Sequence, residues 1–593
     1  MQAGSAWGSI ERRSKNMNER RVKSLVAAML AAGCWGNASA FNFSVGDTRV
    51  AWDSQVIFGL GMRTEGASCA LSGGAPGSDG CASGGNTAQW GNGSLGDRNY
   101  NSGQLYSGYG KLTSEVLLTM PNDWKAMARG SVFYDEMATR TDETRLSPSA
   151  LARVAPNWQM LDLWVSKSWS SGGESGHVRV GNQVLNWGES YFAVGGINAS
   201  NSFDLQKLLT PGVQIKEAVL PAPMISLAQG LGHGFDMEAY LQQGWNHDLY
   251  PAVGTFWSTS NQLGAGAIPA YTLASNPNLS TYPGDPTALV SNYGPDQKPS
   301  QSGQGGLKVH WKPSGSTVDY ALYYENYHDK MPVSGYDATS GTSYFRYLAN
   351  RQLYGFSANA PVADWSVGFE TSFRPHDAVS LTGCYLGTGA VLDANNASSG
   401  SCQNWKDMKK WQFDLVAQLN MQPSDYPFLN AIKANFAVLT FEGTMVRYPD
   451  VTDNGVIKSV QGGQQVVQGL AAGYGAWLQG PTAGTPYQTA ASIGTRNSGG
   501  FTLDFNWTYD GNVLPGWQVN PGMTLFDSVS GYTPNSLGQF MQSAKSINFY
   551  VYFNQNPTVW QAGLNYTRYL GGNPVSQPYG DRDNIGAFVT YNF

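Results

Sequence analysis

Apolar and polar residues alternate along much of the chain, and this alternation predicts β-strands. The clearest segments are residues 365–374, 411–420, 547–554 and 560–567. One face of each segment is apolar and aromatic, whereas the other carries Asn, Gln, Ser, Gly and an occasional charge. Because successive side chains of a strand point to opposite faces, these segments predict strands with one apolar side and one polar side.

The final residues, 585–593, continue the alternation and end on an aromatic side chain, Phe593. In a bacterial outer-membrane barrel, the strands present apolar residues to lipid, and aromatic residues flank the apolar band. The last strand of a soluble sandwich or barrel can alternate in the same way. Composition and an export signal favour the membrane interpretation.

Composition distinguishes the chain from an ordinary soluble β-protein. It contains 19 Trp, 31 Tyr and 24 Phe, and only 13% of its residues are charged, against about 25% in soluble domains. No segment reaches the ~18 apolar residues that a transmembrane helix needs. Because backbone groups in lipid must be paired within the protein, a membrane-spanning chain without such helices forms a closed barrel.

The N-terminal segment is predicted to be an export signal. Met17 is the predicted start; a basic stretch follows it, then a short apolar run and the small residues 38–40. Cleavage there gives a signal peptide of residues 1–40 and a mature chain that begins at Phe41. An alternative is a lipoprotein attached through Cys34. The expected location is the outer membrane of a Gram-negative bacterium.

The predicted fold is therefore all-β: a single transmembrane antiparallel β-barrel formed by residues 41–593. Such barrels favour an even number of strands, and we expect about 16, within a range of about 14–18. Four stretches without alternation are predicted to be long extracellular loops: residues 66–103, 250–306, 375–408 and 447–500. A barrel of this size has room for a channel unless something fills its lumen.

Charge and cysteine content exclude some functions. The formal net charge is −6, so there is no basic excess of the kind that nucleic acid requires. Four cysteines follow the signal segment in two close pairs, Cys69 with Cys81 and Cys384 with Cys402. Other connectivities are possible, but pairing within each loop is the simplest, and an exported protein would keep both disulfides oxidised. The spacing does not favour zinc.

One segment, residues 187–211, interrupts the alternation. It ends in a predicted short helix, with Ser202 as a possible cap, Asp204 in the first turn and Pro211 as the stop. This helical insert could lie in the lumen as a constriction or gate. Alternatively, it could pack on a rim and contribute only stability.

The same region carries a family resemblance. The run 181–189 (GNQVLNWGE), the residues 196–198 and 204–208, and the pair Pro211-Gly212 with the following Lys216-Glu217 resemble the DUF1302 family of exported Proteobacterial proteins. The resemblance covers essentially the whole mature chain. It implies an outer-membrane barrel that handles hydrophobic molecules, with a periplasmic or lipoprotein partner and an inner-membrane transporter. It implies no functional residues.

Residues that could line or constrict the lumen come from the predicted polar faces and from the insert. A charge that faces lipid costs about 2–4 kcal/mol at mid-depth for Arg or Lys, so charged residues within the wall should point inward. They would either set the selectivity of a permeation path or pair with one another and rigidify the lumen. The candidates are Asp53, Gln183, Trp187, Glu189, Asp204, Lys216, Glu370 and Arg374.

No motif of a catalytic, metal or cofactor site is present in the sequence, and we expect no enzyme activity and no cofactor. The leading hypothesis is an outer-membrane channel or transporter for hydrophobic or amphipathic small molecules, such as lipids, steroids or hydrocarbons. One alternative is a general porin for polar solutes. Another is a structural or surface-interaction barrel without a permeation path. The expected partners are outer-membrane lipid and a hydrophobic ligand.

Overall fold

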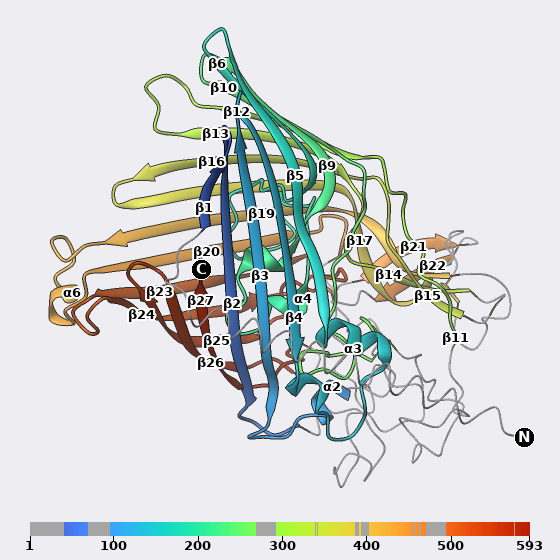
Figure 1. The fold of residues 1–593 in the computed structure, drawn as a ribbon. Coiled ribbons are helices and arrows are strands. Elements are labelled where there is room, and N and C mark those ends of the chain that lie inside the picture. Colours follow the sequence, from blue (N-terminus) through green and yellow to red (C-terminus); the bar gives the residue numbers. More distant parts are fainter. Residues whose placement is uncertain are drawn as a thin grey trace, which may run out of the picture.

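The computed structural model describes most of the chain after residue 40 (Figure 1). The described residues are 41–68, 71, 95–261, 263–267, 292–337, 340, 342–385, 391–392, 402–452, 456–461, 464–469, 494–573 and 576–593. The predicted signal peptide, Cys69 and Cys81 lie outside them.

A closed antiparallel barrel of 18 strands forms the body of the protein. Each strand pairs with the next, and the first, β2, pairs with the last, β27, from Gln55–Asn592 to Arg63–Asn584. The strand number is slightly higher than the predicted value of about 16. The strands are β2 (Thr48–Arg63), β3 (Leu105–Met120), β4 (Trp124–Asp135), β5 (Asn157–Ser171), β6 (Glu174–Gln183), β9 (Ala222–Gly232), β10 (Phe235–Gln242), β12 (Gln304–Trp311), β13 (Asp319–Tyr327), β16 (Arg351–Val362), β17 (Trp365–Tyr385), β19 (Cys402–Met421), β20 (Phe436–Arg447), β23 (Asn497–Asp510), β24 (Trp517–Ser530), β25 (Lys545–Gln555), β26 (Trp560–Leu570) and β27 (Asn584–Asn592).

The alternation of the sequence separates an apolar outside from a polar inside. On β19, Trp411 and Leu415 are exposed on the outer surface, whereas Gln412 and Asp414 are buried. On β26, the same outer face carries the exposed Leu564. The wall therefore presents apolar side chains outward and polar side chains inward, as a lipid-facing barrel requires.

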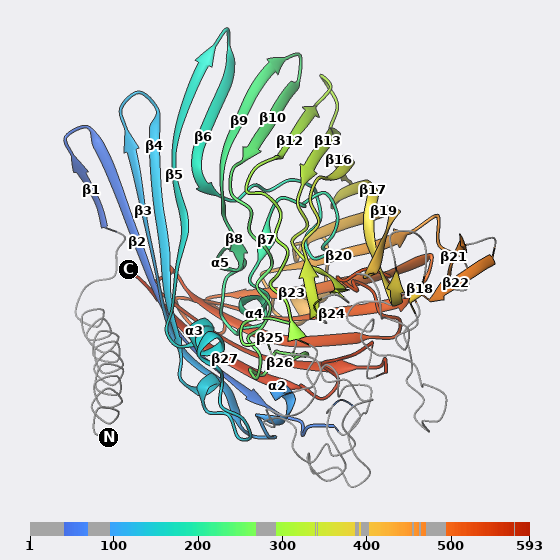
Figure 2. The ribbon, with the colours of Figure 1, turned by 90° about the vertical axis from the view of Figure 1, so that its right-hand side faces the viewer.

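The two ends of the barrel differ in the length of their connections (Figures 1 and 2). Short turns join β3 to β4, β5 to β6, β16 to β17 and β25 to β26. At the turn after β3, Asn122 and Asp123 both adopt positive φ, 58° and 60°, a conformation that Asn and Asp tolerate well. We call this the inner end. The opposite, outer end carries the long connections, as barrels do on the cell-surface side.

The barrel seam continues beyond the last strand. Phe593 exchanges backbone hydrogen bonds with Ser54 of β2, at 2.7 and 2.9 Å. A short strand, β1 (Phe41–Val45), pairs with β2 from Trp52 to Thr48. β27 pairs with β2 only from Gln55 onward, and β1 pairs with the preceding part of β2.

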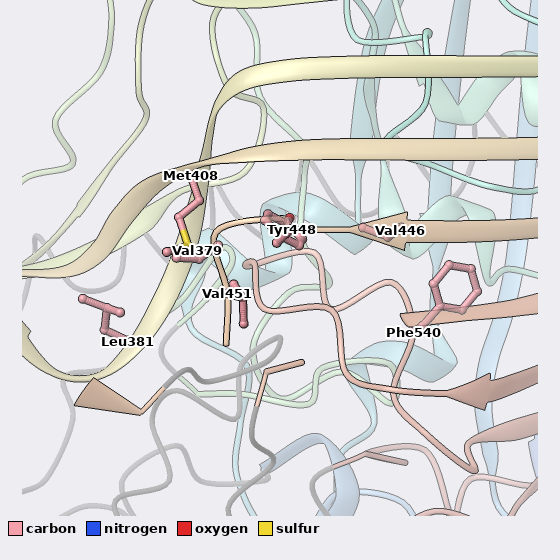
Figure 3. Close-up of a cluster of buried hydrophobic side chains, with 7 residues drawn as sticks. All are labelled: Val379, Leu381, Met408, Val446, Tyr448, Val451 and Phe540. Atoms are coloured by element: carbon pink, nitrogen blue, oxygen red, sulfur yellow. The ribbon is translucent and has the colours of Figure 1, made fainter. Parts of the chain in front are cut away.

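Small elements and buried side chains fill the outer end. The helices are α2 (Leu95–Arg98), η2 (Met137–Thr139) and α3 (Pro148–Val154); α6 (Phe428–Ala431) lies at the inner end. The short strands of the outer connections are β11 (Asn292–Tyr293), β14 (Val333–Asp337), β15 (Thr342–Arg346), β18 (Val391–Leu392), β21 (Val456–Gln461) and β22 (Gln464–Gly469). A hydrophobic cluster joins β17, β19 and β20 to the connection before β25; Figure 3 shows its residues, Val379, Leu381, Met408, Val446, Tyr448, Val451 and Phe540.

Among the described residues, no helix is both long enough and apolar enough to cross a membrane. The predicted helix of residues 202–211 is present only in part. Ser202 and Phe203 form the strand β7, and the helix α4 comprises Leu205–Leu208, with Asp204 rather than Ser202 as its N-cap. The chain stays extended at Ser202 because β7 pairs with β8 (Val219–Leu220).

Candidate functional site

The connection between β6 and β9, residues 184–221, is the most distinctive feature of the lumen, and we call it the insert. Its two ends lie side by side, because Gln183 and Ala222 are paired in register. It contains β7, α4, α5 (Ile215–Ala218) and β8, which Figure 2 shows between the strands β2–β6 and the strands β23–β26. It contacts inward-facing side chains of the wall and residues of the outer connections.

Two wall carboxylates hold the backbone of the insert. Glu442 of β20 accepts hydrogen bonds from the Ser190 hydroxyl at 2.5 Å and from the N–H groups of residues 191, 192 and 193 at 3.1, 2.5 and 3.2 Å. Glu370 of β17 accepts from the N–H groups of Glu189, Ser190 and Ile197 at 2.6, 3.2 and 3.0 Å. Such bonds to an ionised acceptor are stronger than neutral ones. The two carboxylates thus clamp residues 189–197.

Basic side chains satisfy the carbonyl groups of the same segment. Arg374 of β17 donates to the carbonyl oxygens of Gly195 and Gly196 at 2.6 and 2.7 Å, and Lys410 of β19 donates to that of Gly195 at 3.3 Å. Gly195 has φ of +79°, and a Cβ on Gly196 would overlap the Glu370 carboxylate. Glycine is needed here because the backbone passes so close to the wall.

Three further predicted residues hold the start of the insert. Gln183 donates to the Met224 carbonyl at 3.0 Å, which fixes the end of β6 against β9. Trp187 is buried and donates its indole N–H to Glu238 of β10 at 2.8 Å. Glu189 accepts from Ser357 and Asn359 of β16 at 3.1 and 3.2 Å.

The second half of the insert is held by the opposite side of the barrel. Glu217 of α5 is buried, forms an ion pair with Lys111 of β3 and accepts from Thr113 at 2.6 Å. The Tyr109 hydroxyl of β3 donates to the carbonyl oxygen of Pro211. Counted from β2, β3 is the second strand and β17 the eleventh of 18, so they are nine strands apart in either direction. The insert therefore spans the lumen from wall to wall.

A loop from the outer end reinforces this arrangement. Asp248, in the connection after β10, accepts from the Phe203 N–H of β7 at 2.8 Å. Burial raises the pKa of Asp248 to about 7, although this bond and the nearby Lys330 act to lower it. Asp204 caps α4 and pairs with Arg153 of α3 at 2.9 Å. The insert is thus tied to the outer loops as well as to the wall.

Apolar side chains of the insert remain uncovered even though its backbone is held. Tyr191 is 62% exposed, Phe192 43% and Val194 41%. On the other half, Leu208 and Ile215 are exposed. Because the segment lies within the barrel, these side chains face the lumen rather than the lipid. An apolar surface is therefore presented inside a wall that is otherwise mostly polar.

The remaining predicted residues lie elsewhere or play smaller parts. Asp53 is exposed on β2, opposite Glu115 of β3 in register, and Lys216 is exposed on α5. Cys384 and Cys402 lie on β17 and β19, but their side chains are outside the described part of the structure, so the predicted disulfides are not seen. No group of His, Cys, Asp or Glu within the described residues is arranged to hold a metal ion.

Several residues that hold the insert are absent from the sequence-based candidates. Glu442 makes more hydrogen bonds to the insert than any predicted residue does, and Lys111 and Glu217 form its second attachment. Alternation within 436–447 places Glu442 on an inward face, which is the signal that could have identified it. What it meets across the lumen is not visible in the sequence.

Comparison with solved structures finds matches along nearly the whole chain at low sequence identity. Acinetobacter baumannii OccAB1 is 10% identical, with a TM-score of 0.41, over 94% of this chain and 98% of that chain. Pseudomonas aeruginosa OpdK with vanillate is 8% identical, with a TM-score of 0.38, over 91% and 98%. P. aeruginosa OccD3 (OpdP) is 9% identical, with a TM-score of 0.38, over 94% and 93%.

No curated protein matches the chain. The family described as "Protein of unknown function (DUF1302)" matches residues 21–593, which is nearly the whole sequence and agrees with the resemblance of the GNQVLNWGE region. The chain therefore belongs to the DUF1302 family.

Proposed function

We propose that this protein is a non-enzymatic outer-membrane channel that passes hydrophobic or amphipathic small molecules. The observation that carries the proposal is the insert, which crosses the lumen and leaves Tyr191, Phe192 and Val194 exposed there. Their backbone is fixed by Glu442 and the neighbouring basic groups, so the apolar side chains are held at a constant position. Apolar surface in a water-filled lumen favours contact with apolar solutes.

A general porin is the competing function, and the polar inner wall favours it. A wide 18-stranded barrel without an obstruction would conduct ions freely. In this protein, however, the insert is attached at opposite sides of the lumen, through Glu370 on β17 and Lys111 on β3. This arrangement favours selective passage over free diffusion.

The two functions are separated by reconstituting the full chain in liposomes and in planar bilayers. For the proposed channel, we expect saturable uptake of decanoate, negligible sugar-driven swelling and only small ion conductance. Phe192→Ser should lower decanoate uptake several-fold. Phe43→Ser on β1 is the matched control, because Phe43 is similarly exposed, at 47% against 43%, but lies outside the insert. Large stable conductance steps with rapid sugar uptake would overturn the proposal in favour of a porin.

A further inference from the structure

Inward-facing aromatic and glycine residues alternate along one row that crosses five neighbouring strands. Tyr552 of β25 is paired with Gly563 of β26, Gly563 with Phe588 of β27, Phe588 with Gly59 of β2, and Gly59 with Tyr109 of β3. Neighbouring strands lie about 4.8 Å apart, so rings on alternate strands are about 10 Å apart at the backbone. The glycines leave room between them.

The aromatic rings lie over these glycines. A Cβ on Gly563 would overlap the Phe588 ring, and one on Gly59 would overlap the Tyr109 ring. One step along β25, the Tyr550 ring covers Gly522 of β24 in the same way. Each of these glycines therefore leaves space for a ring from the neighbouring strand to lie against its backbone.

Three of these rings form a continuous surface that is open to the lumen, and we call Tyr550, Tyr552 and Phe588 the ring platform. The centroids of Tyr550 and Tyr552 are 4.9 Å apart in a stacked arrangement, and those of Tyr552 and Phe588 are 5.9 Å apart with their planes tilted by 48°. Tyr552 is 36% exposed, and the other two are half-buried. The Tyr550 hydroxyl donates to Asp504 at 3.0 Å, which fixes its ring.

Polar side chains border the ring platform at both ends. Toward the outer end, Asn565 donates to Asn548 at 3.1 Å. Toward the inner end, Gln561 donates to Asn554 at 3.1 Å. All four point inward, in alternation with the outward residues, as do the platform residues on β25 and Gly563 on β26. An apolar face thus lies between two pairs of amide groups.

The ring platform leads directly to the insert. A side chain at Gly212 would overlap Phe588, and Gly212 has φ of +77°, so the insert can cross this ring only as glycine. The next residue, Val213, packs against the buried cluster of Ile57, Tyr109 and Phe133, as Phe588 also does, and Tyr109 is 3% exposed. The aromatic row is open over β25, is crossed by the insert at Phe588 of β27 and is buried at Tyr109 of β3.

We propose that the ring platform binds small amphiphiles that contain a rigid flat ring system. The ring system would stack on the face of Tyr552 and meet the tilted ring of Phe588 at its edge, while polar substituents reach the amide pairs on either side. Faces of aromatic rings bind flat ring systems better than they bind flexible chains, because the contact is planar and little ligand entropy is lost. The inference rests on the proposed transport function and narrows its ligand class.

Binding of two acids of similar size and equal charge, 2-naphthoate and decanoate, tests this proposal. The full chain in lipid nanodiscs is dialysed against each acid, with empty nanodiscs of the same lipid as the blank. For Tyr552→Leu and for Phe588→Leu we expect the Kd of 2-naphthoate to rise about fivefold or more. The Kd of decanoate should change less than about twofold, because leucine preserves an apolar surface.

Phe549→Leu is the matched control, because Phe549 also lies on β25 but faces lipid and is 49% exposed. It should leave both affinities unchanged. If Phe588→Leu disturbs folding through its contact with Gly212, Tyr552→Leu still decides, since the Tyr552 ring lies against Tyr550, Phe588 and Gly563 of the wall. Equal losses for both acids, or no loss, would overturn the ring platform as a binding site.

The same proteins in liposomes separate this inference from the proposed function. If both acids enter the liposomes and Tyr552→Leu slows neither acid more than the other, the protein is still a channel, but the ring platform is not its binding site. Exclusion of both acids by the unaltered chain would contradict the proposed function itself.

Discussion

At the scale of single residues, the wall holds residues 189–197 of the insert largely by their backbone groups. Glu442 and Glu370 accept from consecutive N–H groups, and Arg374 donates to carbonyl groups. Because the polar backbone is satisfied in this way, the side chains of Tyr191 and Phe192 need not make structural contacts. They are free to contact a solute.

Neutralising one wall carboxylate should release part of the insert. Glu442→Gln replaces an acceptor with an amide whose NH₂ group faces N–H donors, and bonds to charged groups contribute about 1.5–3 kcal/mol. We expect the fraction of time spent in a conducting state to rise roughly tenfold to hundredfold, seen as more frequent openings in single-channel records. Glu115→Gln is the control, because Glu115 contacts Arg129 and not the insert. Identical records for the two variants would contradict the clamp.

Asp248 should make the stability of the protein depend on pH. Its pKa is raised from 3.8 to about 7 by burial, so the folded state binds the proton more tightly than the unfolded state. Stability is then highest near pH 4 and falls as pH rises to about 7. Burial lowers the pKa of the adjacent His247, which acts in the opposite direction.

The difference between the protein and Asp248→Asn isolates this contribution, because His247 is common to both. Asparagine can still accept the bond from Phe203 N–H. We expect the variant to melt a few degrees higher at pH 7.5 and to differ little at pH 4.5. Thermal unfolding followed by circular dichroism measures both, and parallel curves across this pH range would refute the assignment.

Residue alternation predicted which side chains point inward but not what they meet. Glu370 and Arg374 were identified because they lie on the polar face of residues 365–374. Their partners, the backbone groups of residues 189–197, depend on a chain crossing the lumen. Glu217 was beyond reach for the same reason, since its partner Lys111 lies 106 residues away.

At the scale of elements, glycines in the strands carry structural information. Gly563 and Gly59 would weaken isolated strands, since glycine has no side chain to pack. In the barrel, each provides the seat for an aromatic ring from the neighbouring strand. Glycine and ring together give the wall a smooth inner surface.

A side chain added at Gly563 should displace the Phe588 ring that lies over it. In Gly563→Ala, the new methyl group would occupy the position of the Phe588 ring, so that ring must turn away from the wall. We expect a loss of about 1–3 kcal/mol, as for other overpacked sites. Gly110→Ala on β3 is the control, since its Cβ would lie 3.4 Å from Phe58, an ordinary contact. Urea unfolding in detergent distinguishes the two variants, and equal midpoints would contradict the seat.

Local signals for helices were less reliable than those for strands. Ser202, Asp204 and Pro211 satisfy the rules for a helix start and stop, yet α4 has only four residues. Pairing of β7 with β8 keeps the first two residues extended, and the Leu249 carbonyl accepts the Leu205 N–H. Tertiary pairing of this kind overrides local propensity.

At the scale of the whole molecule, the fold followed from alternation, aromatic content and few charges. The strand number was less certain, because glycine-rich strands weaken the pattern. β12, for example, begins Gln304-Gly305-Gly306 and overlaps a predicted loop. β17 likewise extends to Tyr385, well into the predicted loop of residues 375–408. Closure at 18 strands depends on pairing across the whole chain.

A charged side chain placed on the outward face of the barrel should destabilise the protein in lipid. Leu564→Arg on β26 places a charge on an outward position that is 52% exposed, and we expect unfolding in lipid vesicles to require about 2–4 kcal/mol less. Asn565→Arg places the same charge at the same depth but inside the lumen, and should cost less than half as much. Equal losses would mean that β26 does not face lipid as the structure indicates.

The position of the insert also bears on how the protein assembles. Its second half contacts Phe588 on β27 and Lys111 on β3, and these two strands flank β2 at the place where the first and last strands meet. The insert therefore links, from inside the barrel, the two strands on either side of β2, where the first and last strands pair. Closure of the wall between β2 and β27 and placement of the insert therefore stabilise each other in the folded protein.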